Sequence, residues 1–272
     1  MAIRKEFDKL TVVDNFMFSI VFRDKERCRR LLEIILDVRI ADVNFPDYEK
    51  TMEESYDGKA IRLDVYVDDE EGTVYDIEMQ ATAKKDLPKR SRYYQGMIDR
   101  ELLSKGQMYG KLKESFVIFI CTFDPFGSEQ YIYTFRNICG EVSGLELLDG
   151  ETKIFVNTRG TKGNASEGLI NFISYLNGNE PQDDFTKEVA ESVLQAKKNE
   201  KWRREFMTWQ ESIDEAVEEA VEEAVQETIQ KAIQEAISRL IKGGMSDEQI
   251  ASYGYSEEEI EGAKEFLRVS VS

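Results

Sequence analysis

Two carboxylates and one carboxamide, Asp64, Glu78 and Gln80, are spaced so that they could act together on one substrate. Apolar and polar residues alternate through residues 61–67 and again through 75–81, which predicts two strands that each have one apolar face. Side chains two positions apart on a strand share a face, so we expect Glu78 and Gln80 to point the same way.

The turn between these strands determines where the third group, Asp64, lies relative to Glu78. A turn at residues 68–72 would place Asp64 diagonal to or directly opposite Glu78. Mg²⁺-dependent phosphodiester cleavage needs such a group of hard oxygen ligands, with room left for water and a phosphate oxygen. The alternative is an amphipathic hairpin with a solvated outer face, which has the same alternation.

The segment that follows the second strand is basic, although the whole chain is acidic. Residues 84–113 carry nine lysines and arginines against three acidic residues, a local charge of +6 in a chain of −18. A basic helix beside a carboxylate pair favours a resting surface for a phosphate backbone; the alternative is an ordinary solvated helix face. The side chains that we expect to contact phosphates are Lys84, Lys85, Lys89, Arg90 and Arg92.

The chain contains no histidine, and this excludes several classes of hydrolytic site. Ser-His-Asp and Cys-His arrangements, histidine-dependent metal nucleases and His-Glu-x-x-His zinc proteases all need that side chain. What remains for hydrolysis is carboxylate chemistry with a metal ion, or no chemistry.

Three motifs in order, Asp64, Glu78-x-Gln80 and Arg92-Tyr-Tyr94, resemble the PD-(D/E)XK nuclease superfamily. More closely, the chain resembles the group of recombination-promoting nucleases and PD-(D/E)XK family transposases. Other stretches that carry this resemblance are residues 10–22, 76–80, 244–250 and 255–260.

The resemblance implies a divalent-metal-dependent DNA endonuclease that hydrolyses phosphodiester bonds and is linked to recombination or mobile DNA. Asp64 and Glu78 would ligate Mg²⁺ or Mn²⁺ with help from the Met79 carbonyl, and Gln80 would orient the attacking water. DNA is the implied partner. The implied fold is α/β (α+β), a restriction-endonuclease-like mixed sheet flanked by helices.

The chain departs from the superfamily pattern at Gln80, where a lysine is usual. Lysine can stabilise developing negative charge, whereas glutamine can orient water but brings no charge. On the family pattern we expect Arg92, ahead of Lys84, to supply the missing positive charge. As accessory candidates we add Tyr93, Tyr94 and, unless it is simply a solvated helix residue, Glu33.

Composition limits the class of protein. A chain of 272 residues with 41% apolar residues suits one main domain with appendages. No run approaches the length of a membrane span, and the N-terminus lacks the pattern of a signal peptide, so we expect neither a membrane segment nor secretion. Three cysteines without metal-ligand spacing favour the reducing cytoplasm.

Periodicity predicts the order of the helices and strands. Residues 115–122 form a continuous apolar run, which is typical of a central strand buried on both faces. We expect helices within 8–37 and at 88–106 and 164–177, and strands at 41–49, 59–67, 73–81, 131–135 and 153–158.

The character of the chain changes near residue 181. We expect a nuclease-like domain at 1–180, a helical extension at 181–242 and a small two-helix module for protein contact at 243–272. The extension should begin with a helix at 186–209, whose aromatic residues pack a helical interface. Ser246 and Ser256 are the expected N-caps of the module's helices.

Residues 215–237 repeat with a period of four, mostly as Glu-Ala-Val-Glu and close variants. At about 100° per residue, each repeat advances about 40° beyond a full turn, so the apolar stripe spirals around the helix. Such a stripe does not fit a heptad seam. Glutamates four apart repel one another, and homo-oligomerisation through the C-terminal helices is one way to cover the stripe.

Two functions stay open at this point. The first is the endonuclease. The second is a catalytically weak or inactive nuclease-fold protein that acts as an oligomeric interaction module, which Gln80, the acidic charge and the repetitive helix favour. A strand-joining transposase rests on the family resemblance alone.

Overall fold

The computed structural model describes residues 5–44, 47–52 and 61–269. The chain divides into two compact units, Met1–Phe206 and Met207–Ser272. Each unit is described below by itself, because their relative positions are not determined.

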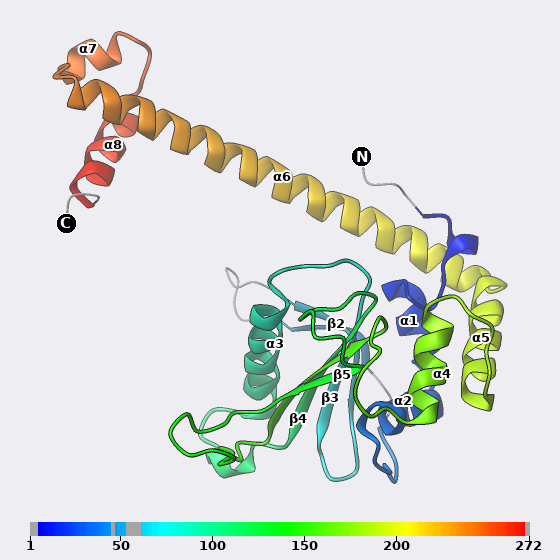
Figure 1. Cartoon of the computed structure of the whole chain (residues 1–272). Coiled ribbons are helices and arrows are strands. Elements are labelled where there is room, and N and C mark those ends of the chain that lie inside the picture. The colour runs from blue at the N-terminus through cyan, green and yellow to red at the C-terminus, as the bar shows by residue number, and fades with distance from the viewer. Residues whose placement is uncertain (1–4, 45–46, 53–60, 270–272) are drawn as a thin grey trace. The chain divides into compact units, whose positions relative to one another are not determined.

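The first unit is built around a mixed sheet (Figure 1). Among the described residues the sheet has six strands in the order β1-β2-β3-β4-β6-β5. The first three strands are antiparallel neighbours, β4 lies parallel to both β3 and β6, and β5 is antiparallel to β6. The strand bounds are β1 Asp47–Met52, β2 Ile61–Asp68, β3 Val74–Gln80, β4 Ser115–Cys121, β5 Ile132–Phe135 and β6 Glu151–Asn157.

Helices cover both faces of this sheet. In Figure 1, α3 lies against one face and the group formed by α1, α2, α4 and α5 lies on the other side. This mixed sheet flanked by helices confirms the predicted fold class. The bounds are η1 Phe7–Lys9, α1 Asn15–Val21, α2 Lys25–Leu36, α3 Leu87–Leu102, η2 Tyr109–Lys111, α4 Glu167–Leu176 and α5 Asp184–Lys197.

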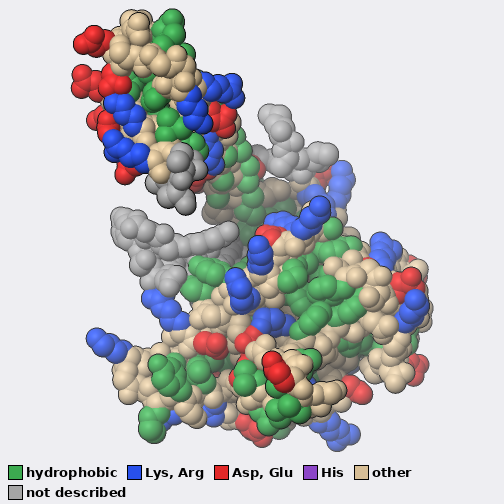
Figure 2. Space-filling view, turned by 60° about the vertical axis from the view of Figure 1, so that its left-hand side comes forward, with side chains coloured by type: hydrophobic (Ala, Val, Ile, Leu, Met, Phe, Trp, Pro, Cys, Tyr) green, Lys and Arg blue, Asp and Glu red, His purple; other side chains and the backbone are tan. Residues whose placement is uncertain are grey.

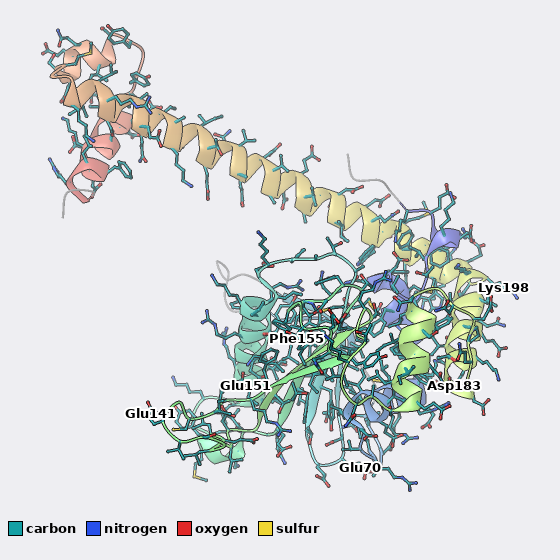
Figure 3. All side chains as sticks on the ribbon, in the orientation of Figure 1. Glu70, Glu141, Glu151, Phe155, Asp183 and Lys198 are labelled. Carbon is teal, nitrogen blue, oxygen red and sulfur yellow. The ribbon has the colours of Figure 1, made fainter. Side chains whose placement is uncertain are left out.

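The centre of the sheet is buried on both faces. All seven residues of β3 are buried, and so are all but one of the residues of β4, as the apolar run at 115–122 predicts. On the α3 side, Phe119 stacks on Phe155 with ring centroids 5.5 Å apart, and Tyr94 of α3 packs on Phe119 at 6.0 Å. Figure 3 labels Phe155 on its strand within this part of the sheet. This packing fixes α3 against the strands that carry the polar residues.

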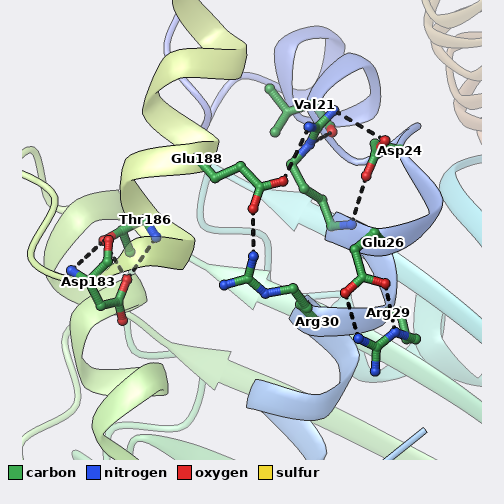
Figure 4. Close-up of polar contacts among 9 residues, drawn as sticks. Val21, Asp24, Glu26, Arg29, Arg30, Asp183, Thr186 and Glu188 are labelled. Atoms are coloured by element: carbon green, nitrogen blue, oxygen red, sulfur yellow. Dashed lines mark hydrogen bonds and ion pairs between the residues drawn. The ribbon is translucent and has the colours of Figure 1, made fainter. Parts of the chain in front are cut away.

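In the helix group on the side of the sheet away from α3, ion pairs join α2 and α5 (Figure 4). Glu188 of α5 accepts from Arg30 of α2 at 2.5 Å and from Arg27 at 3.5 Å. Asp183 caps α5 by accepting from the Thr186 amide at 2.7 Å, and the Thr186 hydroxyl accepts from the Asp183 amide, so the helix start has a capping box. The ion pairs of Glu188 join α5 to α2, and the capping box fixes where α5 begins.

The compact unit therefore continues beyond residue 180, where we expected the nuclease-like domain to end, because α5 packs on α1, α2 and α4. The helix expected at 186–209 is interrupted: α5 ends at its C-cap Lys198, labelled in Figure 3, and α6 begins at Glu200. Phe206 of α6 packs on Phe7 and Phe16 at 5.6 and 5.1 Å, as expected of an aromatic residue at a helical interface. The expected division at 181–242 and 243–272 stays a prediction.

Most of the other predicted elements are confirmed within a few residues. The strand expected at 41–49 is the main exception, since β1 runs over Asp47–Met52 and residues 45–46 lie outside the described residues. Val43 makes only an isolated bridge to Asp69.

The second unit consists of the greater part of α6 (Glu200–Lys242) together with α7 (Asp247–Ala251) and α8 (Glu257–Val269). The last turns of α6 share a small apolar cluster with both short helices, built on Ile237, Ile250, Ile260 and Ala263. Ser246 and Ser256 accept from the amides three residues ahead, which confirms both predicted N-caps. No described helix is both long and apolar enough to span a membrane.

Candidate nuclease site

Asp64 and Glu78 face one another where β2 and β3 part. The antiparallel register pairs Val65 with Ile77, and the next pair along this register is Asp64 with Glu78. The Asp64 amide donates to Glu78 Oε1 at 2.9 Å, and the Met79 amide donates to Asp64 Oδ2 at 3.0 Å. Each carboxylate is thus held by the backbone of the opposite strand, which fixes both side chains at the end of the hairpin ladder.

A third side chain, Asn15, holds Asp64 from outside the hairpin. Asn15 is the first residue of α1, and its Nδ2 donates to Asp64 Oδ2 at 3.1 Å and to Oδ1 at 3.4 Å. Residues 10–22 contribute to the family resemblance, but the pattern gave Asn15 no role. Because it lies 49 positions before its partner, only the fold brings the two together.

Glu78 is a strongly perturbed carboxyl group. It is only 3% exposed, and burial raises its pKa well above the ordinary value, with the nearby charges of Asp64 and Asp76 acting in the same direction. The Arg90 guanidinium, 3.6 Å from Glu78 Oε2, acts against this rise. An acidic group that resists ionisation in this way is typical of a site that receives a cation.

Asp76 is a further carboxylate on the same face of β3 as Glu78, and we did not predict a role for it from the sequence. It is fully buried on β3, two residues before Glu78, and neither of its oxygens makes a hydrogen bond within the described residues. Burial raises its pKa well above the ordinary value, and the charge of Asp64 raises it further. A buried carboxylate without donors is destabilising unless positive charge balances it.

Both the oxygen and the nitrogen of the Gln80 carboxamide are hydrogen-bonded. Arg90 Nη1 donates to Gln80 Oε1 at 2.7 Å, and Gln80 Nε2 donates to the Thr82 carbonyl at 2.7 Å. Arg90 Nη2 also donates to the Tyr94 hydroxyl at 2.8 Å. A guanidinium from α3 therefore lies beside Gln80, the position where the superfamily that the sequence resembles usually carries a lysine.

The arginine of α3 that contacts these residues is Arg90, whereas we expected Arg92 to supply the positive charge; the role of Arg92 stays a prediction. Arg90 lies one helical turn before the buried Tyr94, so its side chain points to the sheet, whereas Arg92 is exposed on α3. Two residues correspond to a rotation of about 200° around a helix, which explains why the two arginines diverge. Among the described residues, Arg90 is the cation that contacts Glu78 and Gln80.

The other predicted phosphate contacts lie on the surface. Lys84, Lys85 and Lys89 are all exposed at the start of α3 and in the segment before it. Figure 2, which brings the α3 side of the sheet forward, shows lysine and arginine side chains spread over this face. These side chains are accessible to a polyanion, but whether they contact one stays a prediction.

The three accessory candidates, Tyr93, Tyr94 and Glu33, have different surroundings. Tyr94 is buried and hydrogen-bonded to Arg90, while Tyr93 packs partly buried against the apolar cluster on the α3 side. Glu33 instead accepts from Arg29 at 2.7 Å and from the Ile40 amide at 2.9 Å, so its carboxylate anchors the end of α2. These contacts give Glu33 a local structural role, and its accessory role stays a prediction.

The donor atoms fit a divalent cation held by two side chains. No three acidic or thiol side chains of the described part of the chain lie together around one position suited to a metal ion. Asp64 and Glu78 nevertheless offer hard oxygen donors, Arg90 lies 3.6 Å from Glu78, and the buried Asp76 follows the same face of β3 without a hydrogen-bond donor. Positive charge is what this group lacks, and Mg²⁺ commonly binds through one or two carboxylates, with water and phosphate completing its shell.

The region of the chain that matches a known protein family includes the residues of this site. Residues 15–176 match the model of the PD-(D/E)XK nuclease family transposases, so the match begins at Asn15 and includes Asp64, Glu78 and Gln80. Neither the curated proteins nor the solved structures contain a match. The matched region is more than half of the chain and supports a nuclease- or transposase-like function. The chain therefore belongs to the PD-(D/E)XK nuclease family transposases.

Proposed function

We propose that this chain is a divalent-metal-dependent DNA endonuclease that hydrolyses phosphodiester bonds. The observation that carries the proposal is the reciprocal clasp of Asp64 and Glu78, in which each carboxylate accepts from the other strand's backbone. A clasp of this kind holds two hard ligands in place before any metal ion arrives, and preorganisation of this sort is what a metal-dependent site requires.

In this proposal each residue has a defined task. Asp64 and Glu78 hold Mg²⁺ or Mn²⁺, and Asn15 fixes the orientation of Asp64. The bound ion supplies Lewis acidity toward the phosphate and lowers the pKa of water. Arg90 keeps positive charge beside Glu78 and orients the Gln80 carboxamide, so charge stabilisation comes from α3 rather than from a lysine on β3.

The proposal extends to the surroundings of the site. The exposed lysines before and at the start of α3 would hold the DNA backbone without reading bases. Cys28, Cys121 and Cys139 are free thiols, which is consistent with action in the cytoplasm. A role in recombination or mobile DNA, and assembly into a homo-oligomer through the C-terminal helices, complete the proposal.

Plasmid nicking tests the activity. Supercoiled DNA is incubated with the chain and Mg²⁺, Mn²⁺ or EDTA, and the variants Asp64→Asn and Glu78→Gln are compared with Glu71→Gln. Glu71 is an exposed carboxylate in the turn of the same hairpin, so it is a matched control. We expect nicking by the wild type and the control in metal only, and a loss of at least about 100-fold in both site variants.

Two outcomes would count against the endonuclease. Equal nicking by all four proteins would identify a contaminating nuclease. No nicking, together with calorimetry that detects no Mn²⁺ binding to the wild type, would favour the nuclease-fold interaction module instead.

A further inference from the structure

The surface of α6 between residues 211 and 232 is ordered into rows four residues apart. One row is apolar and large, and we call it the valine ridge: Ile213, Val217, Val221, Val225 and Ile229. The row before it is small, and we call it the alanine groove: Ala216, Ala220 and Ala224. The remaining half of the circumference is acidic, with a row that includes Glu215, Glu219, Glu223 and Glu227.

Within the second unit, no described residue covers the valine ridge. Its three valines, Val217, Val221 and Val225, are 53%, 56% and 49% exposed, whereas Ile237, which continues the same four-residue spacing, is fully buried by α7 and α8. The same row is therefore a helix-packing surface at its C-terminal end and an open one along its first half. An ordered apolar row that is exposed over several turns marks an interaction surface.

The row spacing selects how a second helix can pack. A ridge of residues four apart is inclined to the helix axis, and two such ridges interdigitate when the helices cross at about −50°. The small alanine groove lies beside the large valine ridge, so each helix offers both the knob and the slot that the other needs. Self-complementarity of this kind is what a two-fold interface between identical chains requires.

We propose that a second copy of this chain docks on the valine ridge, with α6 crossing α6 near Val221 and the valine ridge of each copy seated in the alanine groove of the other. The inference deepens the proposed homo-oligomer and rests on it. Val221 is the middle member of the exposed ridge, and Ala220 is the middle member of the groove, so the crossing point places both rows in register.

The acidic side chains of α6 explain why two copies of this helix should cross at an angle and not pair along their length. Residues 211–227 carry eight acidic and no basic side chains, and a lengthwise pair would hold these segments side by side. In a crossed pair the apolar halves meet and the acidic halves point outward, and the helices diverge on either side of the contact. The remaining repulsion is screened by salt, so dimerisation should become tighter as ionic strength rises.

The contact is small, because two crossing helices meet over only a few turns. Stable interfaces bury at least about 1,200 Å² in total, and one crossing of this kind falls short of that area. We therefore expect a dimer that forms and dissociates with concentration in the micromolar range.

Sedimentation velocity of the full chain from about 1 to about 300 μM tests the proposal. The ridge variant replaces Val217, Val221 and Val225 with glutamine, and the matched control replaces Glu219, Glu223 and Glu227 with glutamine. We expect the wild type to approach twice its monomer mass, the ridge variant to stay monomeric, and the control to dimerise at least as tightly as the wild type. Circular dichroism confirms that both variants keep their helix content.

Cross-linking provides a second readout that does not depend on polar substitutions in the ridge. Ala220→Cys should form a disulfide-linked dimer under mild oxidation, whereas Glu223→Cys, on the acidic side of the same turn, should not. The proposal is overturned by a wild type that stays monomeric throughout, including one that binds only a cationic helical peptide. It is equally overturned if both triple variants dimerise alike. Because no readout involves DNA cleavage, failure of the dimer and failure of the nuclease are distinguishable.

Discussion

Arg90 of α3 donates to the side-chain oxygen of Gln80 on β3 at 2.7 Å, and the same guanidinium lies 3.6 Å from Glu78. One cation thus reaches both motif residues of β3. Position 80 carries no lysine, but the guanidinium of Arg90 on the neighbouring helix brings positive charge beside it. The rings of Tyr94 and Phe119 hold this guanidinium through contacts with their faces.

The first prediction concerns this arginine. Arg90→Gln should lower the rate of DNA cleavage by about 100-fold, equivalent to about 2.7 kcal/mol, because the developing charge loses its stabilising cation. Arg92→Gln, two positions away on the exposed side of α3, should change the rate by less than about threefold. Single-turnover cleavage at saturating Mg²⁺ measures both. Equal reductions in the two variants would return the role to the surface charge of α3 as a whole.

The second prediction concerns Asn15, which orients Asp64 by hydrogen bonds at 3.1 and 3.4 Å. Asn15→Ala should weaken Mn²⁺ binding by about 10-fold or more, because a group that orients a metal ligand contributes to affinity in that range. Titration calorimetry measures the affinity directly, without DNA.

The hairpin provides a matched control for this experiment. Asn44 donates to Asp68 at 2.7 Å, so it makes the same kind of contact at the opposite end of β2. Asn44→Ala should leave Mn²⁺ affinity unchanged. If the two alanine variants bind Mn²⁺ equally well, Asn15 is only a structural residue.

The sequence was sufficient to predict that Asp64 lies diagonal to or directly opposite Glu78, because strict alternation and one short turn leave few ways to fold a hairpin, and the observed register selects the second placement. It was not sufficient for Asn15, since no local pattern links a residue on a helix to a strand that follows far along the chain. The direction of Arg90 could be predicted from the sequence, since its helical spacing from Tyr94 places it toward the sheet. The family pattern instead favoured Arg92. Long-range packing also decides that α5 belongs to the first unit.

The third prediction concerns pH. Asp76 and Glu78 both have pKa values raised above their ordinary range, mainly by burial, so the folded protein holds these protons more tightly than the unfolded chain. Between the unfolded and the folded pKa values, the stabilising contribution of these two groups therefore falls as pH rises. As pH rises from about pH 4 in EDTA, the melting temperature of Asp76→Asn should increase relative to that of the wild type.

Asp124 supplies the contrast for this measurement. Burial opposes its ionisation, but hydrogen bonds from the Tyr133 hydroxyl and from backbone amides outweigh burial and lower its pKa. Its stabilising effect is present above the ordinary carboxyl pKa and is lost as pH falls. Asp124→Asn should therefore destabilise the protein near neutral pH, where Asp76→Asn stabilises it. Melting curves of the two variants that shift in the same direction at neutral pH would refute the raised pKa of Asp76.

The fourth prediction concerns the metal ion and stability together. Mn²⁺ should raise the melting temperature of the wild type, since a ligand that binds only the folded state stabilises it by about 2.7 kcal/mol at 100 times its Kd. The gain should disappear in Asp64→Asn, which removes a ligand charge. It should persist in Glu71→Gln, whose carboxylate lies exposed in the turn. A melting temperature that responds equally in all three proteins would show that the ion binds elsewhere on this acidic chain.

The fifth prediction concerns the basic surface beside the site. Lys84, Lys85 and Lys89 are exposed, and each lysine that rests on a phosphate releases counterions when DNA binds. Replacing all three with glutamine should weaken duplex binding about equally for every sequence. The slope of log K against log salt should become shallower by about one for each lysine that neutralises a phosphate in the wild type. Fluorescence anisotropy in Ca²⁺, between about 50 and about 200 mM salt, measures the slope.

Lys111 and Lys113, exposed at the far end of the basic segment, provide a control of the same residue type, compared per lysine replaced. They lie at the end of η2 and just beyond it, away from the start of α3 where the three lysines of the fifth prediction lie. Replacing them with glutamine should leave the slope nearly unchanged. If it reduces the slope as much per residue as replacing the three lysines before and at the start of α3, the DNA is held by general charge and not along a path that leads to Asp64 and Glu78.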